Sequence, residues 1–216
     1  MLNDSDSRLP RRNFLTRAAA GLAALTGGFP AVAEAAGVNA RGKDSEHDAW
    51  MKAVKGEHRQ LFHGIEINER AMLMAANYLD AYRDAYGAKS GEAGAAIGVH
   101  GPALAIGFND SAWEKYGFGK SMNVVDSATG EPSARNIYAR GGPLSVETLQ
   151  GRGVVFIMCN TGLRLMSQSL AKARNEEAGA VYADLSASRI PGTILVPAMV
   201  VAINRAQEAG FSYLRT

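Results

Sequence analysis

Residues 153–173, GVVFIMCNTGLRLMSQSLAKA, decide how the rest of this chain folds. Branched and apolar side chains run from Val154 to Met158, and apolar residues at helical spacing follow Cys159. The short apolar run predicts a buried strand, and the changed spacing after it predicts a helix. We therefore expect a strand at 154–158, a tight turn, and a helix at 161–174 with Asn160 or Thr161 as its N-cap.

Cys159 is the only cysteine of the chain, and it falls between that strand and that helix. Free backbone N–H groups and the positive end of a helix dipole favour a thiolate at such a place. Open α/β sheets also bind their ligands outside the carboxyl ends of the strands. A single cysteine is equally well a small, inert core residue. Position alone therefore leaves two interpretations of Cys159 open, a reactive thiol and a core residue.

The N-terminus carries the marks of an export signal. A twin-arginine motif, RRNFLT at 11–16, precedes an apolar stretch at 18–29 and an A-x-A cleavage site at 31–33. These parts in this order predict a Tat signal peptide at 1–33 and export by the Tat translocase to the periplasm. The alternative, a segment that stays attached as an anchor, is weaker, because the apolar stretch is short and contains three glycines.

Charge and cysteine count narrow the classes of function. The signal holds four arginines and two aspartates, so acidic and basic residues balance in the remainder. Nothing suggests a basic patch for nucleic acid. One cysteine cannot form an internal disulfide in an oxidising compartment, which favours a reactive thiol or an intermolecular bond. The chain has no G-x-S-x-G, Walker or G-x-G-x-x-G motif, so hydrolase, NTPase and dinucleotide-binding functions have no support.

The rest of the chain alternates between strand and helix patterns. Further strands are predicted at 59–66, 94–100, 193–196 and 211–214, and further helices at 68–86, 103–108, 145–150 and 198–208. This alternation predicts one α/β domain at 57–216, with a parallel sheet covered on both faces. The small, polar residues 34–56 predict a flexible leader that ends in a short helix. The segment 109–143, rich in Gly and Pro, predicts a long irregular insertion that serves as a lid or an assembly arm.

Three residues suited to thiol chemistry follow or end predicted strands: His63, His100 and Cys159. Parallel strands end at the same edge of a sheet, so these residues share that edge. An imidazole there can accept the thiol proton, or as imidazolium can stabilise the thiolate. A thiolate with two imidazoles would also suit zinc or copper. However, the chain lacks C-x-x-C and H-x-x-x-H spacings, so we predict no metal site and no cofactor.

Three segments carry a resemblance to a known family: VHGPAL at 99–104, residues 153–161 with their C-N-T, and LVPA at 195–198 followed by QEAGFSYL at 207–214. In this order they resemble the DsrE/DsrF-like family of sulfur-relay proteins over residues 57–216. The resemblance implies a three-layer α/β/α sandwich with a five-stranded, mainly parallel sheet in the order 4-3-2-1-5. It also implies a homo-oligomer, a trimer or hexamer, and a persulfide-carrying role for Cys159. Sulfur-relay members are typically cytoplasmic, and the Tat signal departs from that pattern.

Two hypotheses of function follow. In the first, this is a periplasmic sulfur carrier or sulfurtransferase-like protein, in which Cys159 takes sulfur from a thiol or persulfide donor and passes it to an acceptor. His100 tunes the thiolate, with His63 as a weaker second. In the alternative, a non-catalytic protein holds a small ligand or a metal in the same crevice. The expected ligand-binding residues around the thiol are Asn68, Gly101, Asn160 and Thr161, and Asn68 is equally well a helix cap.

Overall fold

The computed structural model describes residues 45–216. The predicted signal peptide at 1–33 and most of the predicted leader therefore lie outside the described residues. No helix among the described residues combines the length and the apolar character that crossing a membrane requires.

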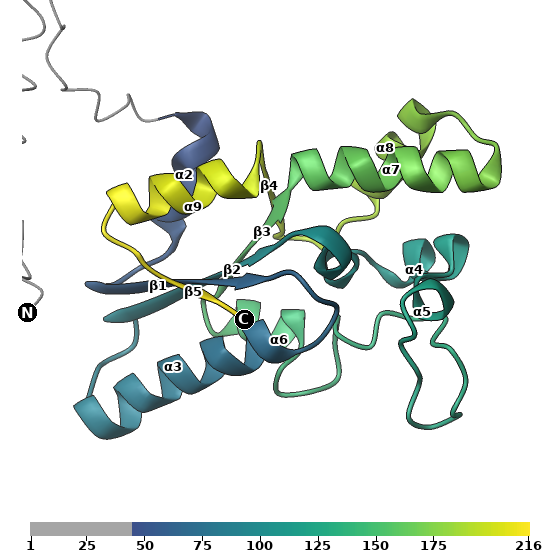
Figure 1. Ribbon diagram of the computed structural model, residues 1–216. Coiled ribbons are helices and arrows are strands. Elements are labelled where there is room, and N and C mark those ends of the chain that lie inside the picture. Colours follow the sequence, from purple (N-terminus) through teal and green to yellow (C-terminus); the bar gives the residue numbers. More distant parts are fainter. Residues whose placement is uncertain (1–44) are drawn as a thin grey trace, which may run out of the picture. The chain divides into compact units, whose positions relative to one another are not determined.

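A five-stranded sheet in the order β4-β3-β2-β1-β5 forms the centre of the domain (Figure 1). Its strands are β1 (His58–Gly64), β2 (Ala93–Val99), β3 (Val155–Cys159), β4 (Ile194–Val196) and β5 (Ser212–Arg215). Every neighbouring pair is parallel, so all five carboxyl ends meet at one edge. The observed strand order is the one that the sequence resemblance implied.

Helices cover the sheet on both faces, which gives the expected three-layer α/β/α architecture (Figure 1). One face carries α3 (Arg70–Tyr86) and α6 (Val146–Gly151). The other carries α2 (Ala49–Ala53), α7 (Asn160–Arg174), α8 (Ala178–Ala187) and α9 (Met199–Glu208). The remaining elements are the 3-10 helices η1 (Glu46–Asp48) and η2 (Gly101–Gly107), and the helices α4 (Asp110–Tyr116) and α5 (Phe118–Ser121).

The central strand β2 has small side chains, and these let the layer of α2 and α9 come close to the sheet. A Cβ atom on Gly94 would collide with the carbonyl oxygen of Lys55, and one on Gly98 would lie 2.7 Å from Sδ of Met199. Both glycines point to the same face, because side chains alternate along a strand. The residues after α2 and the start of α9 therefore rest directly on the backbone of β2.

The prediction for residues 45–56 was right about the helix and wrong about the flexible leader. The short helix expected around 48–54 is present as α2, preceded by η1, but Trp50 and Val54 are buried in the domain core. The indole of Trp50 packs on Phe211, with ring centres 5.6 Å apart. The polar composition around these residues hid the strongly apolar face by which this helix packs on the core.

The prediction of an irregular insertion at 109–143 was also wrong in part. Asn109 caps α4 by accepting a hydrogen bond from the backbone of Ala112, and Gly117 ends the helix in the left-handed region. Trp113 is fully buried and donates from Nε1 to the carbonyl oxygen of Ala105 in η2. The segment therefore begins as two packed helices of the domain, and only the residues after α5 form turns and loops.

Several smaller boundaries differ from the predictions. The helix expected at 103–108 is the 3-10 helix η2, which begins two residues earlier, and the stretch 180–189, which had no prediction, is largely α8. These differences lie at element ends and in short helices, where tertiary packing decides the outcome.

The close packing of Val54 and Lys55 against Gly94 of β2 leads to a prediction about stability. Replacing Gly94 by Ala should lower the free energy of unfolding by about 1–3 kcal/mol, because the new methyl group meets the backbone of Lys55 and the Val54 side chain at 2.9 Å. The matched control is Gly179→Ala in α8, where a Cβ meets nothing within 4 Å. That control should be neutral or stabilising by up to about 1 kcal/mol. Urea denaturation measures both, and equal stability of the two variants would contradict the packing described.

Candidate functional site

Cys159 ends β3 and is itself the N-cap of α7. The prediction that Asn160 or Thr161 caps this helix was therefore wrong. The thiol is 3% exposed, and its Sγ accepts hydrogen bonds from two backbone N–H groups, those of Gly162 and Met199, both at 3.3 Å. No loop separates β3 from α7. The last residue of the strand is therefore also the N-cap of the helix, and its sulfur atom accepts the capping hydrogen bond.

The two donors belong to the first turns of two different helices. Gly162 lies in the first turn of α7, and Met199 is the first residue of α9. The turn before α9 is fixed to the start of α7, since Thr161 donates from its backbone and its hydroxyl to the carbonyl oxygen of Pro197, at 3.2 and 3.0 Å. Two helix N-termini thus meet at one sulfur atom, an arrangement that favours negative charge there.

His100 lies beside Cys159, at the end of the neighbouring strand. The two residues flank Gly162, because a Cβ atom on this glycine would lie 3.5 Å from Cδ2 of His100 and 3.6 Å from Cβ of Cys159. Gly162 therefore leaves the space in which the imidazole and the thiol approach each other. Within residues 45–216 no hydrogen bond joins an imidazole nitrogen to Sγ, and such bonds often tighten only when a substrate is bound.

His63, on the next strand, completes the cluster that the sequence predicted. It is 6% exposed, and its ring centre lies 5.9 Å from that of His100. Nδ1 of His63 is 3.0 Å from the hydroxyl of Tyr213 in β5. Burial, then the nearby His100, then Arg215 lower the pKa of His63 to about 4, so the ring is neutral at neutral pH.

Two imidazole nitrogens of this cluster are buried without a hydrogen-bond partner. They are Nε2 of His63 and Nδ1 of His100. A buried polar atom left unpaired costs about 1–3 kcal/mol. Among residues 45–216, Nε1 of Trp50 and Oγ of Ser186 are also buried without a partner, but only at His63 and His100 do two such atoms belong to neighbouring rings.

The four residues predicted to bind a ligand have structural roles. Gly101 has a φ of +61° at the turn into η2. Asn160 accepts a hydrogen bond from the hydroxyl of Tyr182 in α8, and Thr161 bonds to Pro197. Asn68 accepts from the backbone of Arg70 at the start of α3, but the N-cap of this helix is Glu69, so the alternative role of Asn68 as the cap was wrong. Asn68 also lines a separate open hollow of about 650 Å³.

Two residues of the site were missed from the sequence, Met199 and Tyr213. Met199 gives its N–H to Cys159 and lays its thioether over Gly98, between β1 and β3. Tyr213 holds the ring of His63. A usable signal existed for Met199: it starts the helix after β4, and the implied order places β4 beside β3. Tyr213 could be found only by knowing the register of β5 on β1.

Among the residues that the structure describes, no group of three or more His, Cys, Asp or Glu side chains could hold a metal ion. The thiolate and two imidazoles considered from the sequence therefore do not form a three-ligand set. The side chains of Cys159, His100 and His63 are suited to acid–base and thiol chemistry.

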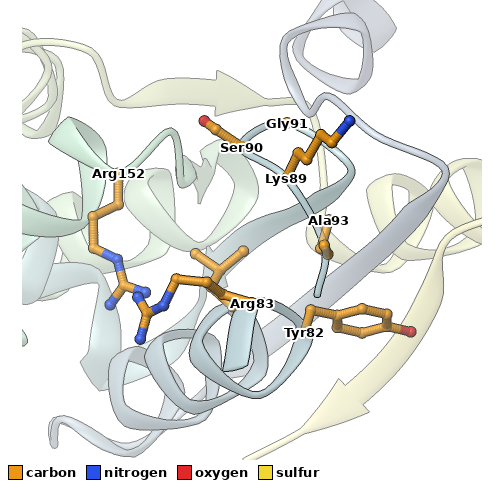
Figure 2. Close-up of a pocket in the computed structure, with 9 residues that line it drawn as sticks. Tyr82, Arg83, Lys89, Ser90, Gly91, Ala93 and Arg152 are labelled. Carbon is orange, nitrogen blue, oxygen red and sulfur yellow. The ribbon is translucent and has the colours of Figure 1, made fainter. Parts of the chain in front are cut away.

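A second hollow, of about 260 Å³, lies toward the opposite edge of the sheet, where β2 and β3 begin (Figure 2). Figure 2 shows the guanidinium groups of Arg83 and Arg152 close together at one end of it. Both bond to the same oxygen of Asp80, at 2.8 and 2.6 Å, and Arg83 also pairs with Asp84. Carboxylates thus already balance these two charges, which makes this hollow a poor candidate for an anion site.

Comparisons with known proteins add little about function. No protein-family model matches the chain, and no curated protein matches it. A solved structure of a protein of unknown function, MTH1491 from Methanobacterium thermoautotrophicum, is similar at 19% identity with a TM-score of 0.41. The match covers 74% of this chain and 100% of that chain.

The neutral state of His63 predicts how stability depends on pH. Its pKa is about 4 in the folded protein and 6.5 in the unfolded chain, so the unfolded chain binds more protons between these values. The free energy of unfolding should therefore fall by at most about 3 kcal/mol as the pH drops from 6.5 to 4, with no further loss from this group below pH 4.

Urea denaturation at several pH values measures this dependence. The variant His63→Phe should lose that part of the slope, whereas His47→Gln, which replaces an exposed imidazole in η1, should keep it. Identical slopes in wild type and His63→Phe would show that the ring of His63 is not held neutral by the fold.

Proposed function

We propose that this protein carries sulfur as a persulfide on Cys159. One observation carries the proposal: Sγ accepts two backbone N–H groups from the starts of two helices, beside two imidazoles, at the carboxyl edge of a parallel sheet. Backbone donors at a helix N-terminus stabilise a thiolate, which is the nucleophilic form of cysteine. The resemblance to the DsrE/DsrF-like family and the predicted Tat signal support a periplasmic, homo-oligomeric protein of that kind.

The chemistry is a sulfur transfer without net oxidation. The thiolate of Cys159 attacks the outer sulfur of a donor persulfide, a new S–S bond forms on Cys159, and the S–S bond of the donor breaks. The donor leaves as a thiolate, and an acceptor thiolate later removes the outer sulfur in the same way. The proton of the Cys159 thiol goes to a nearby base, for which His100 is the nearest imidazole.

The burial of Cys159 limits which sulfur donors can reach its thiol. At 3% exposure, the thiol does not meet a broad protein surface. A low-molecular-weight persulfide or polysulfide fits this site better than a folded donor with a recessed cysteine. Met199 gives its backbone N–H to the thiol, while its side chain lies over Gly98.

The same burial favours a second candidate function, the non-catalytic binding of a small polar ligand. In this case the unpaired nitrogens of His63 and His100 hold the ligand, and Cys159 is a packed residue with a structural N-cap role. The reactivity of the thiol in the folded protein separates the two candidates.

The sulfur-carrying function predicts a gain in mass. Wild-type protein incubated with a small polysulfide should gain the mass of one or more sulfur atoms, and a reductant should remove it, because Cys159 is the only thiol of the chain. Intact-mass spectrometry measures the gain. The control is Cys159→Ser, which should gain nothing. Loading of that variant, or no loading of a reduced wild type, would reject the proposal.

Thiol titration gives a further prediction. In the native protein a small uncharged reagent such as iodoacetamide should modify Cys159 within minutes, whereas a bulky disulfide reagent should react at least about tenfold more slowly, since the thiol is buried. In denaturant both should react freely. A native thiol that resists both reagents would support the ligand-binding function instead.

A further inference from the structure

We infer that Cys159, His100 and His63 form a triad in which His63 acts on His100 and not on the thiol. His100 takes the thiol proton on Nε2, and its Nδ1–H donates to Nε2 of His63, which Tyr213 holds in place. This deepens the proposed function, because it assigns the residues that prepare the same thiol. It requires a reactive thiol but not sulfur transfer, so the two can fail separately.

The orientation of His100 is the first step of the argument. Its Cδ2 atom lies 3.5 Å from where a Cβ of Gly162 would be, so this edge of the ring faces α7 and Cys159. Nδ1 is on the opposite edge of an imidazole from Cδ2. It is buried without a partner, and since the Cδ2 edge faces α7, the Nδ1 edge faces away from that helix.

His63 has a matching unpaired atom. It pairs in register with Gly98 of β2, whose neighbour on β3 is Ile157, two residues before Cys159. Side chains two residues apart share a face, so His63 and Cys159 lie on the same face of the sheet. Nε2 of His63 is buried without a partner, and the ring centres of His63 and His100 are 5.9 Å apart. A direct N–H···N bond of about 3 Å needs a separation of about 5 Å, a small adjustment.

The triad uses the tautomer of His63 that carries its proton on Nδ1. The hydroxyl of Tyr213 lies 3.0 Å from this nitrogen and accepts a hydrogen bond from it in the triad. The lone pair of the neutral ring is then on Nε2, where Nδ1–H of His100 can donate. The arrangement is a nucleophile, a base and a third group that orients the base, the pattern of activated thiols and hydroxyls.

The charges around the imidazoles of His63 and His100 favour the proton on His100, the ring next to the thiol. Arg215 of β5 disfavours an imidazolium on His63, and η2 contributes no ionisable side chain. The charged residues of α9 are engaged elsewhere, since Arg205 pairs with Asp48 and with Glu208. Ionisable groups next to the pair include Cys159, Tyr213 and Arg215. A positive charge on His100 is stabilised by a thiolate, and one on His63 is opposed by Arg215.

The test is the rate of Cys159 alkylation by iodoacetamide as a function of pH, measured on the full-length protein by mass spectrometry. Wild type should react at pH 6 at a rate close to its rate at pH 8, because in the triad His100 takes the proton of the thiol. His63→Phe should react about tenfold more slowly at pH 6 and at the wild-type rate at pH 9, where the thiolate forms without help. His63→Asn should restore part of the rate, since its amide oxygen can accept from Nδ1 of His100.

A second variant is needed because His63→Phe also changes the size of the side chain at position 63. Tyr213→Phe removes one hydroxyl and should lower the rate at pH 6 by about twofold to fivefold. The matched control is Tyr182→Phe, which removes a hydroxyl bonded to Asn160 at the start of α7 and should leave the profile unchanged.

Profiles of His63→Phe and Tyr213→Phe that coincide with wild type would overturn the triad, and so would a wild-type rate that rises tenfold for each pH unit up to pH 8. The result is separable from the sulfur test. A wild type with the predicted profile that gains no sulfur would retain the triad and reject the carrier function. A wild type that gains sulfur, while His63→Phe and Tyr213→Phe keep the wild-type profile, would support the carrier function and reject the triad.

Discussion

The lack of side chains at two positions of β2 is the constraint on which the site depends. Gly98 lets the thioether of Met199 rest on the strand, and Gly94 lets the residues after α2 do the same. Because α9 starts so close to the sheet, its first N–H reaches Sγ of Cys159, 40 residues away along the chain. A larger side chain at 98 would lift α9 and remove one of the two donors from the sulfur.

The parallel arrangement supplies the other condition. With β3, β2 and β1 adjacent and parallel, residues at or just after their carboxyl ends come to one edge, and alternation puts Cys159 and His63 on one face. The same geometry directs the N-termini of α7 and α9 to that edge. A thiol, two imidazoles and two helix starts thus meet without any long loop being needed to bring them together.

The site combines a buried Cys159 and a buried His63 with incomplete hydrogen bonding. The sulfur is paired with two N–H groups, whereas one nitrogen of each imidazole is not paired. Elsewhere the core is apolar around Trp113, Phe156 and Leu104, although Nε1 of Trp50 and Oγ of Ser186 are also buried without a partner. The site differs from those two positions because its unpaired nitrogens belong to neighbouring rings at the edge where Cys159 lies.

The sequence by itself determined the strands, the long helices and the edge at which His63, His100 and Cys159 lie, because apolar periodicity and strand–helix alternation are local signals. The strand order came from the resemblance. Only the tertiary structure decided the N-cap role of Cys159, the donor from Met199 and the hold of Tyr213 on His63. These depend on how closely α9 approaches β2 and on the register of β5, and packing between distant segments sets both. For the same reason the helices at 110–121 were missed: both are short, and burial against the core stabilises them more than their own sequence does.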